Sequence, residues 1–264
     1  MKYQPGDGIQ RYFDEVTRLQ QVVVESQKEL LTEVAVKMAE IIRRKARIFL
    51  FGTGHSHMLC EEAYYRAGGV LCTVPLFQPM ILQLHESARL SSMLERMPEL
   101  AFPILDEYDP QPGEMLFVYA DSGSNELPVQ IAIEARRRGV IVVGVGSFKY
   151  AEIAPETVIG KKLFDVVDYA IDNHGVPGDA LVEVESTGWR VAASSTITGA
   201  TVWNCLLTEA VFCLHEAGEP LPITASFNMP GAAEHNQSLL QEWSKVNPHL
   251  PARNITLRRK ADGE

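Results

Sequence analysis

Apolar residues recur at helical spacing through the first part of the chain. From about Ile9 to Lys45 they stand three, four or seven positions apart, and neither Pro nor Gly interrupts them. This spacing predicts one amphipathic helix, or two in tandem, because residues three and four apart share a helix face. We expect this N-terminal helical extension to pack on a sheet or a sister subunit rather than to carry chemistry.

After Arg47 the pattern changes to short, continuous apolar runs closed by small residues. Such runs, apolar on both faces, are typical of the buried strands of parallel sheets. The sequence predicts five strands, over residues 48–51, 70–74, 115–120, 140–145 and about 166–171. Helical patterns stand between or after them, over residues 56–67, about 86–108, 125–138, 194–217 and 232–246.

This alternation of strands and helices predicts an α/β fold. We expect a three-layer, doubly wound (flavodoxin-like) sheet of five parallel strands with helices on both faces. A chain of 264 residues fits one large domain. Its expected parts are N-terminal helices in residues 1–45, an α/β core in 46–218, and a C-terminal loop, helix and tail in 219–264.

Charge and cysteine usage narrow the possible partners. The formal net charge is −10, from 34 acidic and 24 basic side chains, which disfavours nucleic acids and anionic membranes. The four cysteines include no C-x-x-C pair, which predicts reduced, buried thiols. The N-terminus has no signal-peptide pattern, and no stretch approaches the roughly 18 apolar residues of a membrane helix, so we expect a cytoplasmic protein.

Two polar loops that contain glycine follow predicted strands. Their polar side chains are Thr53, His55, Ser56 and His57 in loop 1 (residues 51–57), and Ser122, Ser124 and Asn125 in loop 2 (residues 120–126). In an open parallel sheet such loops meet ligands, and the N–H groups at helix starts attract anions. With Ser147 after the fourth strand and the hydroxyls at 194–198, they favour one phosphorylated small molecule. For each loop taken alone, plain N-capping is the alternative.

Loop 1 does not match the common nucleotide-binding motifs. His57 stands where a dinucleotide-binding loop has a third Gly or Ala, and no acidic residue follows about 20 positions later. The chain has no G-K-[ST] sequence, and Ser122 lacks the first glycine of G-x-S-x-G. Because His55 and His57 alone do not make a metal site, we expect neither a metal nor an organic cofactor.

Several motifs together resemble the sugar isomerase (SIS) family of phosphosugar-binding domains. They are G-T-G-H-S at 52–56, D-S-G-S-N at 121–125, G-S at 146–147 and P-G-A-A-E-H-N at 230–236. G-H-S-H-M at 54–58 and E-E-x-x-Y-R-A-G-G at 61–69 resemble a poorly characterised bacterial branch of this family. The resemblance spans about residues 8–250, and phosphoheptose isomerases and N-acetylmuramic acid 6-phosphate etherases are more distantly similar.

The resemblance implies a sugar-phosphate ligand and a homodimer or homotetramer whose sites use both subunits. The substrate-binding residues it implies are Gly52, Thr53, Gly54, His55, Ser56, His57, Ser122, Gly123, Ser124, Asn125, Ser147, Ser195 and Thr196. Two positions depart from the family pattern. Asp121 stands where Asn or Ser is usual, and Asn125 stands where many members have Thr.

Proton transfer to and from a sugar needs a base for a carbon-bound proton and an acid for the oxygens. On the predicted helix after loop 1, His57 and Glu61 share a face and Glu62 lies beside them. An exposed glutamate pair is the alternative interpretation. Phosphoheptose isomerases carry a Glu ten residues after the loop serine, where this chain has Arg66, so Glu61 or Glu62 would have to substitute.

Two further pairs are candidates for proton transfer. Glu234 and His235 belong to the closing motif, and His85 and Glu86 begin a predicted helical segment. The sequence therefore predicts a phosphosugar isomerase or an etherase-type lyase. A non-catalytic module that senses a sugar phosphate is the alternative, because the same loops would serve either role. A purely oligomeric scaffold would bind no ligand.

Overall fold

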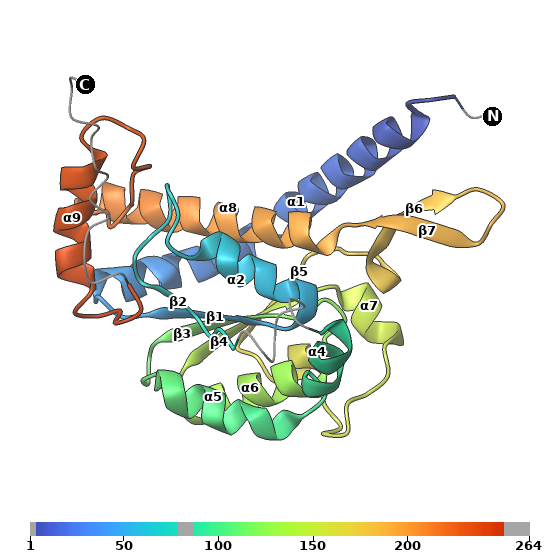
Figure 1. Ribbon diagram of the computed structural model, residues 1–264, viewed down its shortest axis with the longest axis horizontal. Helices are drawn as coiled ribbons and strands as arrows, with labels where there is room; N and C mark the ends of the chain where they lie inside the picture. Colours follow the sequence, from blue (N-terminus) through green and yellow to red (C-terminus); the bar gives the residue numbers. More distant parts are fainter. Residues whose placement is uncertain (1–3, 79–86, 251–264) are drawn as a thin grey trace, which may run out of the picture.

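The computed structural model describes residues 4–78 and 87–250. The N-terminal segment forms one helix, α1 (Asp7–Arg43), rather than two in tandem. The first turns of α1 project from the body beside a two-stranded hairpin (Figure 1). Arg11 of α1 pairs with Glu185 of this hairpin at 2.9 Å. The helix and the hairpin thus form an arm that extends beyond the sheet.

The predicted parallel sheet is confirmed, with strand order β2-β1-β3-β4-β5 and parallel pairing throughout. Its strands are β1 (Ile48–Gly52), β2 (Thr73–Pro75), β3 (Met115–Tyr119), β4 (Ile141–Gly146) and β5 (Tyr169–Asp172). The edge strand β2 is shorter than the sequence predicts, because Val70 forms an isolated antiparallel bridge with Ile223 instead. The central strands β1 and β3 are fully buried, as their unbroken apolar runs indicate.

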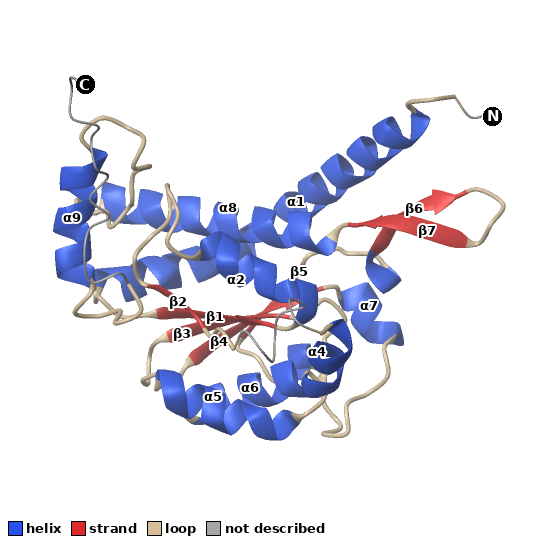
Figure 2. Ribbon diagram, in the orientation of Figure 1, coloured by secondary structure: helices blue, strands red, loops and turns tan. Residues whose placement is uncertain are grey.

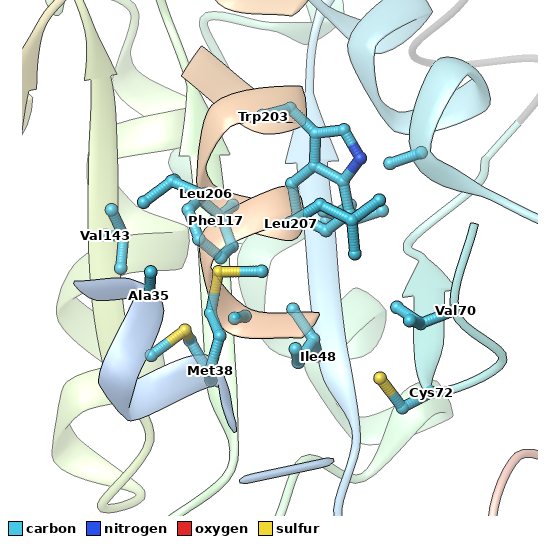
Figure 3. Packing of buried hydrophobic residues seen from close by; sticks show 14 of the residues in the cluster. Ala35, Met38, Ile48, Val70, Cys72, Phe117, Val143, Trp203, Leu206 and Leu207 are labelled. Carbon is cyan, nitrogen blue, oxygen red and sulfur yellow. The ribbon is translucent and has the colours of Figure 1, made fainter. Parts of the chain in front are cut away.

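Helices cover both faces of the sheet, which gives the three predicted layers (Figure 2). One face packs on α1, α2 (His57–Ala63) and α8 (Ser195–Glu216). Figure 3 shows this core, where Met38 of α1 and Trp203 of α8 lie near Phe117 of β3. The other face packs on α5 (Ala101–Tyr108) and α6 (Glu126–Arg137).

One helix within the described residues is long and apolar enough to cross a membrane by length and composition alone. It is α8, in which an 18-residue window reaches a mean hydropathy of 1.4 and is 44% buried. Trp203, Leu206 and Ala210 of this helix are buried in the core beside the sheet. The sequence predicts that no segment is apolar enough to form a membrane helix, and α8 does not fit that prediction. The core helix of a globular protein, however, also passes this test of length and hydropathy.

The structure contains elements that the sequence pattern did not predict. They are the hairpin β6 (Ala180–Val184) and β7 (Trp189–Ala193), the helix α7 (Phe148–Ile153) and the short 3-10 turns η1 (Gly54–Ser56), η2 (Pro98–Leu100), η3 (Leu163–Asp165) and η4 (Pro177–Asp179). All five residues of β7 are exposed. In β6 only Leu181 is buried, against Val16 and Leu19 of α1, so the hairpin lacks the regular alternation that identifies a strand.

Predicted helix boundaries shift where the backbone turns. The helix expected over 56–67 ends at Ala63, because Tyr64 is extended (φ −96°, ψ 133°) and Tyr65 is left-handed with φ 41°. The segment near 86–108 contains α4 (Ala88–Leu94) in addition to η2 and α5. The last described helix is α9 (Ala232–Trp243). All four cysteines are free; Cys60 and Cys72 are buried as predicted, whereas Cys205 and Cys213 are partly exposed.

Candidate functional site

Loop 1 folds back tightly on the end of β1. A Cβ atom on Gly52 would lie 2.7 Å from both the carbonyl carbon and the carbonyl oxygen of Ser56. Gly54 has φ 54°, a left-handed conformation that favours glycine. The two glycines therefore permit the turn that brings Thr53 and Ser56 to the start of α2.

Loop 2 lies next to loop 1, because β1 and β3 are parallel neighbours with Gly52 opposite Tyr119. Gly123 has φ 61°, and Ser122 and Ser124 flank it. The Ser124 hydroxyl donates to the carbonyl of Pro155 at 2.8 Å. The amide of Ser124 donates to the Ser122 hydroxyl oxygen at 3.4 Å. The structure thus brings together the hydroxyls of both predicted phosphate loops at the carboxyl edge of the sheet.

Glu95, the residue after α4, connects the two loops. Thr53 Oγ1 of loop 1 donates to Glu95 Oε2 at 2.9 Å, and the side chain of Asn125 in loop 2 also hydrogen-bonds to this carboxyl. The amide of Leu127 donates to the Glu95 carbonyl at 3.0 Å. The Glu95 side chain is 14% exposed, and its burial raises the pKa of the carboxyl.

Sequence reasoning missed Glu95. It stands in a helical segment between strands, where a glutamate is an ordinary surface residue. No spacing rule connects it with Thr53, which lies 42 residues away. The contact arises only because the chain after β2 returns to the edge of the sheet where both loops end.

Asp121, at the start of loop 2, is a second buried carboxyl. Its Oδ1 accepts a hydrogen bond from Asn173 Nδ2 at 2.8 Å, whereas its Oδ2 is buried and has no hydrogen-bond partner among the described residues. Burial is the main cause that raises the pKa of Asp121 to about 6; the nearby carboxylates of Asp179 and Asp172 add to this effect, and the Asn173 hydrogen bond opposes it. This carboxyl is therefore costly to ionise.

Ser147 and the hydroxyls at the start of α8 already serve structural hydrogen bonds. Ser147 is fully buried; its hydroxyl donates to the Gly175 carbonyl at 2.5 Å and accepts from the Tyr150 amide, which caps α7. Ser195 Oγ donates to Asp179 Oδ2 at 2.6 Å, and the Ser195 amide donates to Asp179 Oδ1.

The Asp179 carboxylate therefore occupies the N-terminus of α8, where an anionic ligand would otherwise sit. Thr196 stands in the same turn and is half-buried. A role for Ser147, Ser195 or Thr196 in ligand binding remains a prediction.

The glutamates of α2 lie on the outer side of this helix. Glu61 is 48% exposed, and its Oε1 lies 3.5 Å from Nε2 of the buried His57. His57 Nδ1 donates to the carbonyl of Gly54, which ties the helix to loop 1. Glu62 forms an ion pair with Arg66 one turn later. The predicted pairing of His57 with Glu61 on one face is therefore present, whereas Glu62 is engaged by a cation.

Glu234 and His235 do not join loops 1 and 2 within one chain. Both are exposed in the first turn of α9, and His235 Nε2 donates to the Ile223 carbonyl at 2.8 Å. Lys45, just before β1, pairs with Glu242 of α9 at 2.5 Å. This pairing places α9 at the amino edge of the sheet, opposite the loops (Figure 1). The other candidates, His85 and Glu86, lie outside the described residues.

The described residues contain no group of three or more His, Cys, Asp or Glu side chains that could hold a metal ion. His55 is exposed, whereas His57 is buried and bonded to Gly54. The chemistry available at the carboxyl edge is therefore that of hydroxyls, backbone amides and two carboxyls with raised pKa values.

Comparison with known proteins places this chain in a family. A family model described as the SIS domain matches residues 11–147. A UPF0309 protein of Halalkalibacterium halodurans is 39% identical over 244 residues, which cover 92% of this chain and 97% of that protein. A UPF0309 protein of Listeria monocytogenes serotype 4b is 35% identical over 243 residues, with coverages of 92% and 98%.

Among solved structures, a phosphoheptose isomerase from Francisella tularensis superimposes with a TM-score of 0.50. Its sequence identity is 12%, and the match covers 79% of this chain and 98% of that one. At this identity the likeness shows the fold alone. Both the family model and the UPF0309 relatives confirm the resemblance that the loop motifs indicate, and the chain belongs to the SIS domain family.

Proposed function

We propose that loops 1 and 2 bind the phosphate group of a sugar phosphate. The observation that carries this proposal is the convergence of both loops at the ends of the paired strands β1 and β3. There, Ser56 and Ser122 offer hydroxyls beside the start of a helix, which suits a tetrahedral anion. The hydroxyls of Thr53 and Ser124 donate to Glu95 and to the Pro155 carbonyl, so these residues position the two loops. Membership of the SIS family and the shared fold with a phosphoheptose isomerase support it.

The reaction that we propose is an isomerisation or an elimination by proton transfer. Both reactions move a carbon-bound proton next to a carbonyl, which carboxyls and histidines can accept and return. Glu61, with His57 beside it, is the proton-transfer candidate closest along the chain to loop 1. Glu62 is held by Arg66 and is the weaker candidate. A sensing module that binds the same ligand without turnover is the second candidate, because the hydroxyls alone would suffice for binding.

Proton NMR in D2O tests this function. The purified protein is mixed with hexose, heptose, amino-sugar and muramic acid 6-phosphates in turn. An isomerase or lyase would introduce deuterium at the carbon beside the carbonyl, or produce new sugar signals. Line broadening without exchange would establish the sensing module. Spectra that stay unchanged with every sugar phosphate would contradict the proposed binding.

Serine variants test whether the hydroxyls of loops 1 and 2 bind the ligand. The double variant Ser56→Ala, Ser122→Ala should lose sugar-phosphate binding by at least tenfold, because each lost charge-assisted hydrogen bond is worth about 1.5–3 kcal/mol. Ser238→Ala, at an exposed position on α9, is the matched control and should bind as the wild type does. Equal affinity in the double variant would refute the assignment of these hydroxyls.

The homo-oligomer implied by the family is also part of this proposal. The arm exposes large apolar side chains: Ile9 is 79% exposed, Phe13 is 61% exposed and Trp189 is 77% exposed. A groove of about 530 Å³ runs between α1 and the hairpin, and exposed apolar patches of this kind mark interaction sites. A second subunit on this arm would explain them. Sedimentation equilibrium should give a dimer or tetramer, and a monomeric mass at micromolar concentration would contradict this assembly.

A further inference from the structure

Glu95 is the carboxyl that lies in direct contact with the proposed phosphate site. Its Oε2 accepts from Thr53 Oγ1 at 2.9 Å and lies 3.9 Å from the Cβ position of Gly54. Asn125 of loop 2 bonds to the same side chain. A ligand held by both loops would therefore lie beside this carboxyl.

The surroundings of Glu95 give its negative charge little compensation. Arg96 Nη1 lies 3.4 Å from Glu95 Oε1, but the Arg96 side chain is 57% exposed and hydrated. Among the described residues, the other charged group near Glu95 is the carboxylate of Glu126 in α6, which opposes ionisation. Thr53 and Asn125 are neutral partners. Burial and, to a smaller extent, Glu126 both raise the pKa of the Glu95 carboxyl.

A phosphate dianion on the loops would add further negative charge within a few ångströms. At an effective dielectric constant of about 20, one ionised carboxylate at about 6 Å would weaken binding of an anion by at least tenfold. A protonated carboxyl at the same place would instead donate a hydrogen bond to the anion.

We propose that Glu95 belongs to the ligand site and carries a proton when a phosphorylated ligand is bound. The proposal rests on the proposed function, because it assumes that loops 1 and 2 hold the anion. The proton comes from the solvent and adds to a carboxylate oxygen of Glu95. The O–H bond then points at the ligand, while the second oxygen keeps its hydrogen bond from Thr53. The site therefore binds its ligand more tightly at low pH.

Inorganic sulfate is the probe, because it is a tetrahedral dianion that does not titrate between pH 5.5 and 8.5. Its affinity is measured by isothermal titration calorimetry across this range. Wild-type affinity should fall as pH rises, with a slope approaching tenfold per pH unit above the pKa of Glu95. Glu95→Gln keeps an acceptor for Thr53 and cannot ionise. This variant should bind sulfate with little dependence on pH, and at pH 8.5 at least tenfold more tightly than the wild type does.

Matched variants isolate Glu95 from other titrating groups. Glu99→Gln removes a neighbouring exposed glutamate in η2 and should leave the slope unchanged. Protonated histidines in loop 1 would also favour an anion at low pH. His55→Asn and His57→Asn therefore serve as separate controls, and neither should abolish the slope. Glu126→Gln should shift the dependence towards lower pH without removing it, because the Glu126 carboxylate raises the pKa of Glu95.

The outcomes distinguish this inference from the proposed function. An equal slope in the wild type and Glu95→Gln, or weaker sulfate binding by Glu95→Gln at pH 8.5, would overturn the role of Glu95. Sulfate binding that survives Ser56→Ala, Ser122→Ala unchanged would overturn the proposed function instead. Failure of both sulfate and inorganic phosphate to bind the wild type would contradict both.

Discussion

Replacing Asp121 with asparagine should stabilise the folded protein selectively at high pH. The Asp121 carboxyl has one hydrogen-bonded oxygen, on Asn173, and one buried oxygen without a partner in the described structure. Its neighbours Asp172 and Asp179 carry the same charge. The substituted amide would keep an acceptor oxygen for Asn173 and would remove the charge, so Asp121→Asn tests the cost of that charge directly.

The magnitude follows from the pKa of Asp121, which is raised from 3.8 to about 6. Because the folded pKa is the higher one, the folded state binds more protons than the unfolded state between these values. Ionisation of Asp121 therefore destabilises the folded state increasingly as pH rises through this window. The full cost above pH 6 is about 3 kcal/mol, at 1.36 kcal/mol per pKa unit. Below about pH 3 the carboxyl is mostly protonated in both states and the cost disappears.

Urea unfolding at pH 4 and pH 8, followed by tryptophan fluorescence, measures this effect. Trp203 is 1% exposed in the core, so its emission reports global unfolding. The variant's unfolding free energy, relative to the wild type, should increase by about 2.5 kcal/mol from pH 4 to pH 8, because the unfolded carboxyl is already partly ionised at pH 4.

A fixed penalty for the buried amide NH2 cancels in this difference between the two pH values. Asp14→Asn, at an exposed position on α1, is the control and should show no such increase. A pH-independent difference between wild type and Asp121→Asn would refute the reasoning.

Two further substitutions test the loop geometry and a buried ion pair. Gly52→Ala places a Cβ 2.7 Å from the Ser56 backbone, so it should cost about 1–3 kcal/mol and weaken sugar-phosphate binding at least tenfold. Thermal unfolding measures the change in stability, and calorimetry measures the change in affinity. Gly8→Ala, with open space around it, is the control. Wild-type affinity in Gly52→Ala would contradict the geometry. Glu134, 3% exposed, pairs with Arg137 and Arg138, which lower its pKa to about 2. Because Arg137 is 72% exposed, Glu134→Gln should lower the free energy of unfolding by only about 1–2 kcal/mol at pH 7, and by less as pH falls towards 2. An equal loss in urea unfolding at pH 7 and pH 3 would refute this.

The parallel sheet could be predicted from the sequence because its central strands are buried on both faces. The runs at residues 48–51 and 115–120 are apolar without interruption, a pattern that few other elements produce. The hairpin of β6 and β7 could not be predicted in the same way. Its residues are mostly exposed, and its position depends on contact with α1, which lies far away in the sequence.

A local motif predicts the loop on which a site residue lies, but it does not predict the tertiary contacts that the side chain makes. Loops 1 and 2 lie side by side because they follow β1 and β3, which are parallel neighbours in the sheet. Asp179, which lies 16 residues earlier on the turn η4, accepts the hydrogen bond of the Ser195 hydroxyl that a ligand would otherwise accept. Such a contact has no signature in spacing or composition, so the sequence could offer Ser195 only as a free hydroxyl.

The two buried carboxyls give the carboxyl edge of the sheet a property that the hydroxyls alone would not. A site made of serines and backbone amides would hold a phosphate dianion with an affinity that rises until the phosphate is fully ionised. Glu95 beside loop 1 and Asp121 at the head of loop 2 oppose that trend, because both resist ionisation and both acquire negative charge as pH rises. Asp121 interacts with Asn173, Asp172 and Asp179, so we expect its ionisation to act mainly on the stability of loop 2. Glu95 touches Thr53 and Asn125, so its ionisation acts on the ligand itself.

The separate variants Asp121→Asn and Glu95→Gln should therefore affect different measurements, the first chiefly unfolding and the second chiefly anion binding. A single shared effect on both would show instead that the two loops respond to charge as one unit.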